Sequence, residues 1–430
     1  MNYLRFSAGS NSPLLRQLFR WLCVLLVMTS AIASSDDCEF RQITFGLDQL
    51  SLPGPPPSVS ADGRRVVFAS GFDLLGTNPD MNEEVFVHDA ETGLTQITDT
   101  IGVFNRTPTI SDDGRLIAFI SNGNLTGLNA DSNLEVFLLE VESGILSQAT
   151  DTTAWFHESP DLDDTGNTLV ILSNTNPTGS NGDNSKEIFV LDLSSMVYIQ
   201  VTNTSDDGVG DPVISGNGTT IAFRSSNDLV PGSNPDRNTE LFYSRQGSPL
   251  VQVTYTTAGF NDEADLSWSG SRLAFTSTND LVPGSNTDLN GEVFIWDLGI
   301  GFTQITSTSA GPPTYAPTID DEGHLIAFIS GHEIVPGQNP FELDHLFVWE
   351  ASTAEFTQIT FGDDEPNVFP DVSGSGISVV FYSMGELVPG GNPTGDFQIF
   401  ARVCGLFRDG FVTGDLRRWS SGSGGSQRAY

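Results

Sequence analysis

Oxygen-bearing side chains alternate with other residues in a short segment that recurs along the chain. In the first copy, Asn78, Asp80, Asn82 and Glu84 stand at every second position. Carboxylate and amide oxygens at this spacing are ligands that calcium takes from a tightly curled loop. We call this segment the acidic ladder and consider it a candidate calcium site. Its other members are Asn129, Asp131, Asn133 and Glu135; Asn181, Asp183, Ser185 and Glu187; Asn234, Asp236, Asn238 and Glu240; and Asn286, Asp288, Asn290 and Glu292.

A second interpretation of the ladder needs no metal. Asn and Asp side chains also hydrogen-bond to nearby backbone and so shape turns. The spacing lacks the full EF-hand pattern, and two later copies break it, one at Phe341 and Leu343 and the other at Thr394 and Gln398. Calcium is the one cofactor that the sequence suggests, and a series of Asx turns is the alternative.

The sequence contains no arrangement typical of a catalytic site. A Gly-x-Ser-x-Gly segment, the nucleophile elbow of many hydrolases, does not occur. His332 precedes Glu333, but no second histidine follows at metalloprotease spacing. The other histidines are scattered over different parts of the chain, at His88, His157, His324 and His345. We therefore predict no catalytic residues.

The ladder belongs to a unit of about 52 residues that recurs seven times. Each copy has an apolar step, a turn such as Ser60-Ala61-Asp62-Gly63, an apolar strand, a long loop with the ladder, and two further strands. Asp before Gly favours a tight hairpin. A period made of four strands predicts an all-β fold, a seven-bladed β-propeller of four-stranded blades over residues 34–404. The copies begin at Pro57, Pro108, Pro160, Pro212, Ala264, Pro317 and Pro370.

The seventh copy ends after its third strand, so its fourth strand must come from elsewhere. The segment Arg-Gln-Ile-Thr at residues 41–44 matches the Thr-Gln-Ile-Thr of the other fourth strands. We expect this N-terminal strand to complete the last blade and remove its open edge. Cys38 and Cys404 then flank the turn between the third and fourth strands, which predicts a disulfide. Two free thiols are the alternative.

The recurring Ser-x-Asp-Gly turn, the strand ending in Ala-Phe-x-Ser and the Glu-Val-Phe-Val strand resemble the TolB-like, WD-type-like propeller repeat. The resemblance covers residues 38–404. It implies the propeller fold, and it implies no single function, because the family includes binding proteins, periplasmic scaffolds and enzyme-associated domains.

The loops after the second and fourth strands should emerge on one face, which we call the long-loop face. Ligand or partner contacts are expected there. Several aromatic residues stand just before the first strands of their copies, with one histidine and one tyrosine nearby. They either rim a pocket at the mouth of the channel or fill the contact between neighbouring blades. These residues are Phe104, Phe156, His157, Phe260 and Tyr315.

The two ends of the chain indicate export. Residues 1–33 combine arginines, an apolar run from Trp21 to Met28 and a small-residue site at 31–33, which is typical of a signal peptide. An uncleaved anchor is the alternative. Residues 405–430 resemble C-terminal segments of secreted bacterial proteins that read Asp-Gly-Phe-x-x-Gly-Asp-x-x-x-Trp-Ser, and suggest either a sorting element or a flexible tail.

The charge of the chain limits its partners. Without the three arginines of residues 1–33, the 18 basic residues fall to 15 against 55 acidic residues, a net charge of −40. Such a surface repels nucleic acid and anionic lipid. We expect no nucleic-acid partner, no membrane span after cleavage, a monomer, and a location in the periplasm or outside the cell.

Two functions are compatible with this sequence. The preferred one is a non-catalytic scaffold that binds a protein or an envelope polymer through the long-loop face. The alternative is a propeller enzyme, a hydrolase or lyase acting on a glycan or small ester at the channel mouth.

Overall fold

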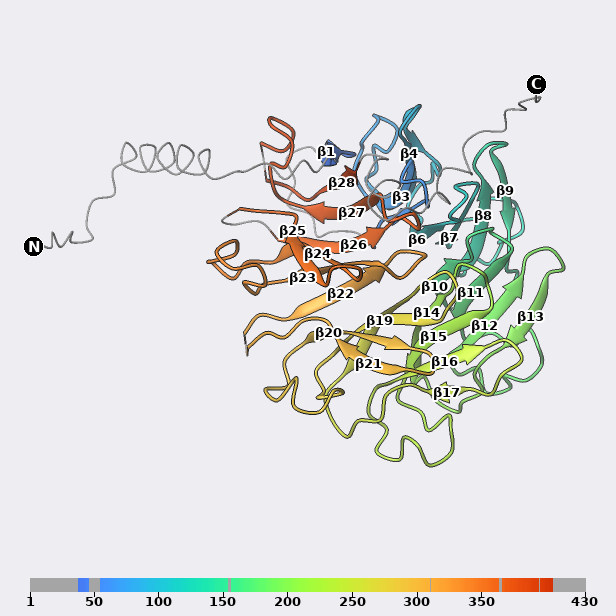
Figure 1. Cartoon of the computed structure of the whole chain (residues 1–430). Coiled ribbons are helices and arrows are strands. Elements are labelled where there is room, and N and C mark those ends of the chain that lie inside the picture. The colour runs from blue at the N-terminus through green and yellow to red at the C-terminus, as the bar shows by residue number, and fades with distance from the viewer. Residues whose placement is uncertain are drawn as a thin grey trace, which may run out of the picture. The chain divides into compact units, whose positions relative to one another are not determined.

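A computed structural model describes residues 38–45, 55–153, 156–309, 311–362, 366–393 and 395–404. All secondary-structure elements within these residues are β-strands, and they form seven four-stranded sheets. The sheets follow one another in chain order around a central channel (Figure 1). The predicted seven-bladed β-propeller is confirmed.

The blades are numbered in chain order. Blade 1 contains β2 (Ser58–Val59), β3 (Arg65–Ser70), β4 (Glu84–Asp89) and β5 (Gly93–Gln96); blade 2 contains β6 (Asn105–Ile110), β7 (Leu116–Ser121), β8 (Glu135–Glu140) and β9 (Ile145–Gln148); blade 3 contains β10 (His157–Leu162), β11 (Thr168–Ser173), β12 (Glu187–Asp192) and β13 (Val197–Gln200); blade 4 contains β14 (Val209–Ile214), β15 (Thr220–Ser225), β16 (Glu240–Arg245) and β17 (Val251–Gln252). Blade 5 contains β18 (Asn261–Leu266), β19 (Arg272–Ser277), β20 (Glu292–Asp297) and β21 (Gly301–Gln304); blade 6 contains β22 (Thr314–Ile319), β23 (Leu325–Ser330), β24 (His345–Glu350) and β25 (Glu355–Gln358); blade 7 contains β26 (Asn367–Val372), β27 (Ser378–Ser383), β28 (Gln398–Cys404) and β1 (Cys38–Gln42).

The Ser-x-Asp-Gly turn joins the first and second strands of a blade. In blade 1 the Gly63 N–H donates to the Ser60 carbonyl at 2.8 Å. The Asp62 carboxylate accepts hydrogen bonds from Ser60 Oγ and from the Arg64 N–H. Gly63 has a φ of 69°, which glycine adopts without strain. The motif therefore specifies a tight hairpin, as its sequence predicts.

The first strand of each of blades 2 to 7 contains a bulge at the position where the repeat begins. In blade 3 the pairing of β10 with β11 shifts between Glu158 and Asp161. Ser159, the residue before Pro160, has a φ of 47°. Proline has no N–H to give to a ladder, and a bulge re-aims the side chains beside it. The bulges place the prolines and the residues after them around the central channel.

Stacked phenylalanines fill the middle of most blades. In blade 1 Phe68 of β3 lies opposite Phe86 of β4, with ring centroids 5.6 Å apart, and both are buried. The hydrophobic clusters join residues of two neighbouring blades, for example Leu138 of blade 2 with Leu169 of blade 3. Each blade therefore completes the core of the next, which explains the apolar runs of the second and third strands.

The last blade is closed by the N-terminal strand, as predicted. β1 pairs with β28 (Figure 1). Immediately after β1, the Ile43 N–H donates to the Ile399 carbonyl at 2.8 Å, and Thr44 Oγ1 donates to Gln398 Oε1 at 2.9 Å. Cys38 and Cys404 are both disulfide-bonded, which confirms the predicted disulfide.

The predicted signal peptide (1–33) and the predicted sorting segment (405–430) lie outside the described residues. Among the residues that are described, no helix has the length and apolar character needed to cross a bilayer.

Candidate functional site

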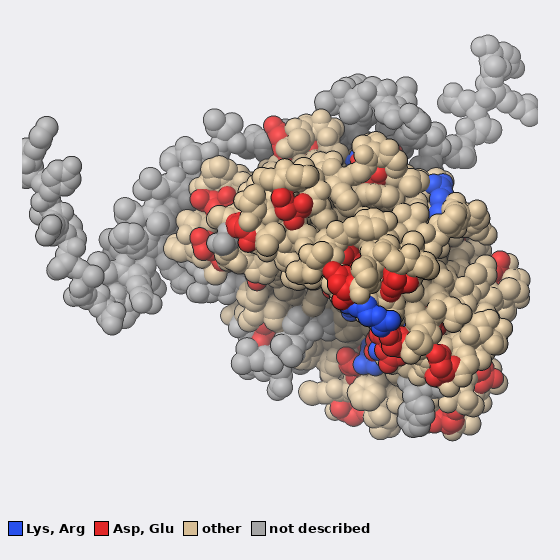
Figure 2. Space-filling view, turned by 90° about the horizontal axis from the view of Figure 1, so that it is seen from below, with Lys and Arg blue, Asp and Glu red and all other residues tan. Residues whose placement is uncertain are grey.

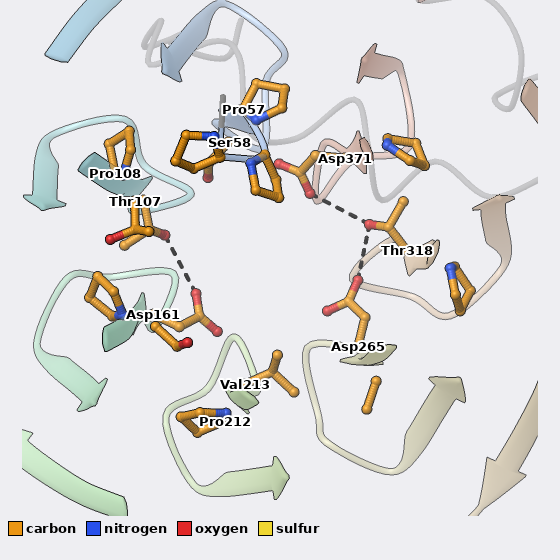
Figure 3. Close-up of a pocket in the computed structure, with 18 residues that line it drawn as sticks. Pro57, Ser58, Thr107, Pro108, Asp161, Pro212, Val213, Asp265, Thr318 and Asp371 are labelled. Carbon is orange, nitrogen blue, oxygen red and sulfur yellow. Dashed lines mark hydrogen bonds between the residues drawn. The ribbon is translucent and has the colours of Figure 1, made fainter. Parts of the chain in front are cut away.

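The first strands of all seven blades surround a cavity of about 360 Å³ in the central channel (Figure 3). The residue that follows the repeat-start position in each blade lines this cavity. This residue is an aspartate in three blades and a hydroxyl residue in three others. The seven positions, in blade order, are Ser58, Thr109, Asp161, Val213, Asp265, Thr318 and Asp371. We call them the channel ring.

The three aspartates of the channel ring hold neighbouring blades together. Asp161 accepts a hydrogen bond from the Ile214 N–H of blade 4 at 2.9 Å. Asp265 accepts one from the Ile319 N–H of blade 6 at 2.8 Å, and Asp371 one from the Val59 N–H of blade 1 at 2.8 Å. Each carboxylate thus satisfies a backbone donor across a blade boundary that would otherwise be buried without a partner.

Hydroxyl groups of the same ring connect the aspartates. Thr318 Oγ1 lies 3.0 Å from Asp265 Oδ2 and 3.5 Å from Asp371 Oδ1, and bridges blades 5 and 7 (Figure 3). On the other side of the cavity Thr109 Oγ1 lies 3.4 Å from Asp161 Oδ1.

Burial raises the pKa of all three channel-ring aspartates, because a carboxylate removed from water is less stable than the neutral acid. The pKa of Asp161 rises to about 7. Burial raises it most and repulsion by Asp265 raises it further, while the backbone hydrogen bond from Ile214 lowers it. The pKa of Asp371 rises to about 8 for the same main reason, with Asp265 again repelling it. The pKa of Asp265 is also raised by burial. Among the described residues that line the cavity there is no Lys or Arg to offset these charges.

A second group of carboxylates lies at the turn end of the channel. The second residue of the turn between the first and second strands is Asp112 in blade 2, Asp164 in blade 3 and Asp321 in blade 6. This turn reads Asp-Asp-Thr-Gly in blade 3 and Asp-Asp-Glu-Gly in blade 6. Carboxylate oxygens of these three residues all lie within 4.8 Å of one another, which makes them the one acidic or histidine trio this close among the described residues. We call them the turn trio.

Backbone hydrogen bonds between neighbouring turns hold the turn trio in place. The Ala61 N–H donates to the Asp112 carbonyl, the Asp164 N–H to the Gly216 carbonyl and the Asp321 N–H to the Gly374 carbonyl, each at 3.0 Å. A side chain at either of two glycines would force the trio to move: a Cβ on Gly216 would lie 2.1 Å from Asp164 Oδ1, and one on Gly374 would lie 2.1 Å from Asp112 Oδ2.

The turn trio is also harder to ionise than ordinary carboxyl groups. Burial raises the pKa of Asp112 and of Asp321, and repulsion by the surrounding carboxylates raises both further. The hydrogen bond between the two raises the pKa of Asp112 and lowers that of Asp321. The pKa of Asp164 rises to about 7 through burial and the repulsion of Asp321. Carboxylates this close need shared protons or a bound cation to remain together.

A third acidic patch lies where the cavity opens toward the long-loop face. Asp211, Asp262 and Glu263 line an adjoining hollow of about 430 Å³. Arg224 forms an ion pair with Asp211 and lies 3.2 Å from Asp262. Figure 2 shows one face of the molecule, with acidic side chains spread widely over it and basic ones confined to a few places.

The acidic ladder divides into buried and exposed members. In every blade the first asparagine is buried, and its Nδ2 donates to the backbone carbonyl four residues on, for example from Asn78 to Asn82 at 2.9 Å. The glutamate is buried and accepts hydrogen bonds from the following loop: Glu84 Oε1 accepts from the Thr100 N–H at 2.6 Å. The aspartates are exposed: Asp80, Asp131, Asp183, Asp236 and Asp288.

The oxygens of the ladder do converge, but a group of the chain itself fills the space between them. In blade 3, Ser185 Oγ lies 3.3 Å from Asn181 Oδ1 and 3.0 Å from both Asp183 Oδ1 and Glu187 Oε1. In blade 1 the Asn82 amide takes the corresponding place, donating to Glu84 Oε1 at 2.9 Å. These contacts support the loop-shaping interpretation, and calcium binding by the ladder stays a prediction.

The predicted binding-face aromatics do not form one group. Phe104 and Phe260 are exposed, with relative exposures of 55% and 44%. Phe156 packs against the core between blades 3 and 4, and Lys186 Nζ lies 3.9 Å from its ring centroid. Tyr315 packs against the core of blades 6 and 7 and donates to Asp344 at 3.2 Å. His157 is fully buried, 3.5 Å from Glu135.

The channel ring and the turn trio are the residues that sequence reasoning missed. Their signal lies in two variable positions of the repeat: the residue after each repeat-start position, and the second residue of the turn between the first and second strands. Aspartates at these positions stand 52 or more residues apart in the chain, yet they meet on the axis because every copy contributes one residue there.

No protein-family model matches the chain, and no curated protein matches it. Many solved structures do. An oligogalacturonate lyase in complex with manganese has 13% identity and a TM-score of 0.56, with 86% of this chain and 99% of that chain covered. The β-propeller domain of the trilobed protease from Pyrococcus furiosus has 12% identity and a TM-score of 0.55, with 82% of this chain and 96% of that chain covered.

TolB from Acinetobacter baumannii is also similar, at 16% identity and a TM-score of 0.43, with 71% of this chain and 66% of TolB covered. The chain thus spans just under two thirds of TolB. The likeness to the lyase and to the protease domain shows the β-propeller fold alone. No family model confirms the TolB-like repeat family.

Proposed function

We propose that the chain is an exported, non-catalytic binding propeller whose channel takes up a cationic segment of a protein partner. The observation that carries this proposal is the channel ring. Three half-buried aspartates line one cavity to which all seven blades contribute, and the described residues that line it include no basic side chain. A cavity of this kind offers a guanidinium or ammonium group hydrogen-bond acceptors and negative charge.

The pKa values of the channel ring favour a cationic occupant. Asp161 and Asp371, with pKa values of about 7 and 8, carry protons for part of the time near neutral pH. A positive charge beside them would stabilise the carboxylates and displace those protons. The net charge of −37 would also attract a basic segment from a distance.

Export is the second part of the proposal. A disulfide forms and persists in oxidising compartments, and the disulfide of Cys38 and Cys404 fits the signal peptide that the sequence predicts. We accordingly propose that the chain resides in the periplasm or outside the cell and that its partner is a protein of the envelope.

The proposal is tested with the mature chain and short peptides of defined charge. Arginine and lysine hexamers should bind, and a glutamate hexamer should not. An Asp161→Asn, Asp371→Asn double variant should bind the basic peptides at least about tenfold more weakly. The matched control, Asp236→Asn with Asp288→Asn, replaces the same number of carboxyl groups in the exposed ladder and should leave the affinity within about twofold. Equal losses in both variants would contradict a channel site.

A channel enzyme is the second candidate, and the raised pKa values favour it. A carboxyl group that titrates near 7 is suited to general acid–base chemistry. Turnover of a glycan or small ester that Asp161→Asn abolishes, and that Asp236→Asn leaves intact, would replace the binding proposal with this one.

A further inference from the structure

Three large apolar side chains are exposed where the two long loops of blade 1 meet. Met81 belongs to the ladder of this blade, and Ile101 and Phe104 belong to the loop that leads from β5 to β6. Their relative exposures are 57%, 87% and 55%, and that of Ile101 is the highest of any large apolar side chain among the described residues. We call these three residues the apolar patch. Apolar side chains that are exposed together mark surfaces for a partner, whereas single ones need no explanation.

Hydrogen bonds between the two loops hold the patch together. Asn82 Nδ2 donates to the Val103 carbonyl at 3.1 Å, and the Gly102 N–H donates to Asp80 Oδ2 at 3.3 Å. Met81 lies between Asp80 and Asn82 in the chain, so these bonds bring it beside the second loop.

The second loop is anchored on both sides of Ile101. Before it, the Thr100 N–H and Oγ1 both donate to the buried Glu84, at 2.6 and 2.7 Å. After it, the Val103 side chain lies against Gly123 of blade 2, where an added Cβ would come within 3.0 Å of Val103 Cγ1. An anchored loop thus presents Ile101 to solvent, which lowers the entropy cost of binding a partner there.

The fold does not need an apolar residue at the position of Ile101. The threonine whose N–H donates to the ladder glutamate recurs in blades 2 to 5, as Thr152, Thr204, Thr256 and Thr308. A hydroxyl residue follows it each time: Thr153, Ser205, Thr257 and Ser309. Since the same loop contacts form with these polar residues, the apolar surface of Ile101 is available to a partner.

The charge around the patch indicates which partner fits. The two loops, residues 71–83 and 97–104, contain four acids and no Lys or Arg. The acids are Asp73, Asp80, Glu83 and Asp99. Arg106 is the first basic residue after them and belongs to β6. A second copy of the chain, with its net charge of −37, or an anionic lipid surface would be repelled here, whereas basic residues would complement the four acids.

We propose that the apolar patch is a docking surface for a segment of a protein partner in which apolar side chains are flanked by lysine or arginine. The apolar side chains of the segment cover Ile101, Met81 and Phe104, and its basic side chains face the surrounding acids. An apolar centre with a polar rim is the usual arrangement of a protein interface. None of the three patch residues lines the channel cavity, so this inference does not rest on the function proposed for the channel ring.

A random dodecapeptide library displayed on phage tests the proposal with the mature chain. The library is selected on the unaltered chain and counter-selected on a Met81→Ser, Ile101→Thr double variant, which carries the residues that blade 2 has at these positions, Ser132 and Thr153. Counter-selection removes peptides that bind elsewhere, the channel included, because the variant keeps every other surface. The peptides that remain should combine aromatic or aliphatic residues with lysine or arginine.

The affinity of one selected peptide, prepared by synthesis, is then measured by isothermal titration calorimetry. The double variant should bind it at least about tenfold more weakly, and its melting temperature should stay within about 2 °C of that of the unaltered chain. The matched control is Ile300→Thr, because Ile300 is almost as exposed, at 85%, but lies in the turn between β20 and β21. This control should leave the affinity within about twofold.

Four results would overturn the proposal. The first is that no peptide survives counter-selection, and the second is that the survivors lack apolar residues or carry acidic residues in place of basic ones. The third is concentration-dependent self-association, seen by sedimentation, that the double variant abolishes, because a second copy would then be the occupant. The fourth is binding to phosphatidylcholine vesicles that the double variant abolishes. Failure of the channel to bind basic peptides would leave all four outcomes unchanged.

Discussion

Asp371 in the last blade accepts a hydrogen bond from the backbone N–H of Val59 in the first, at 2.8 Å. The place where the ring closes is therefore held by a carboxyl group that also lines the channel. Asp161 and Asp265 do the same at two other blade boundaries. The residues that offer negative charge to a ligand are thus the residues that join the blades, so ligand binding, protonation and stability must be coupled.

The free energy of unfolding should fall as the pH rises from 5 to 8.5. In the unfolded chain aspartate titrates near pH 4, whereas the pKa values of Asp161 and Asp371 in the folded chain are about 7 and 8. Between these values the folded chain binds more protons than the unfolded chain. The contribution is complete below about pH 4 and is lost as the pH rises through the folded pKa.

Urea unfolding at several pH values measures this slope. Each unit of pKa shift corresponds to at most about 1.4 kcal/mol. Asp371→Asn, which stays neutral and keeps an acceptor for Val59, should flatten the slope, and Asp236→Asn at an exposed position should not. A free energy of unfolding that rises between pH 5 and 8.5 would contradict the raised pKa values of the channel carboxyls in the folded chain.

Gly374→Ala should destabilise the chain by about 1–3 kcal/mol. The added Cβ would lie 2.1 Å from Asp112 Oδ2 and 2.6 Å from Asp321 Oδ2, so the turn trio would have to move. Gly182→Ala is the matched control, because a Cβ there meets nothing within 4 Å, and it should change the stability by less than about 0.5 kcal/mol. Equal effects of the two substitutions, measured by urea unfolding, would indicate that the turns do not pack as described.

The sequence predicts the propeller well because its signals are local. The Asp-Gly hairpin at Asp62 and Gly63, the apolar second strands and the recurring Thr-Gln-Ile-Thr segment each act within one copy, and their sevenfold recurrence implies closure. Cys38 and Cys404 could be paired from the same repeat. The acids of the channel could not be predicted in this way. Asp112 and Asp321 are 209 residues apart and occupy a position that glycine, alanine or tryptophan fills elsewhere, so only the ring brings them together.

The buried glutamates of the ladder should matter for stability more than its exposed aspartates. Glu240 accepts hydrogen bonds from Thr256 Oγ1 at 2.8 Å and from Asn261 Nδ2 at 3.2 Å. Glu240→Ala would remove the acceptor of the Thr256 hydroxyl and one of the acceptors of Asn261 Nδ2, and should cost about 2–4 kcal/mol. Asp236→Ala should cost less than about 0.5 kcal/mol.

Thermal melting with calcium or with a chelator tests the same loops. The loop-shaping interpretation predicts that Asp236→Ala leaves any calcium-dependent shift of the melting temperature unchanged. Loss of such a shift in Asp236→Ala would establish the ladder as a calcium site.

Removal of the disulfide should weaken the closure of the last blade. Cys38→Ser with Cys404→Ser deletes the covalent link between the N-terminal strand β1 and its neighbour β28. Linking two ends of a chain this long stabilises by about 2–4 kcal/mol. The same loss should appear when the unaltered chain is unfolded in reducing buffer, and the double variant should not respond to the reductant. A double variant as stable as the oxidised chain would show that β1 is held by its hydrogen bonds alone.

Proton release on binding is the most direct test of the cationic channel. Calorimetric titration of an arginine hexamer into the mature chain at pH 7, repeated in buffers with different ionisation enthalpies, reports the number of protons released. We expect release at pH 7, less at pH 9 where the channel carboxyls are already ionised, and clearly less from the Asp161→Asn, Asp371→Asn variant, which keeps Asp265 alone. Binding without proton release at pH 7, or the same release from that variant, would contradict the account.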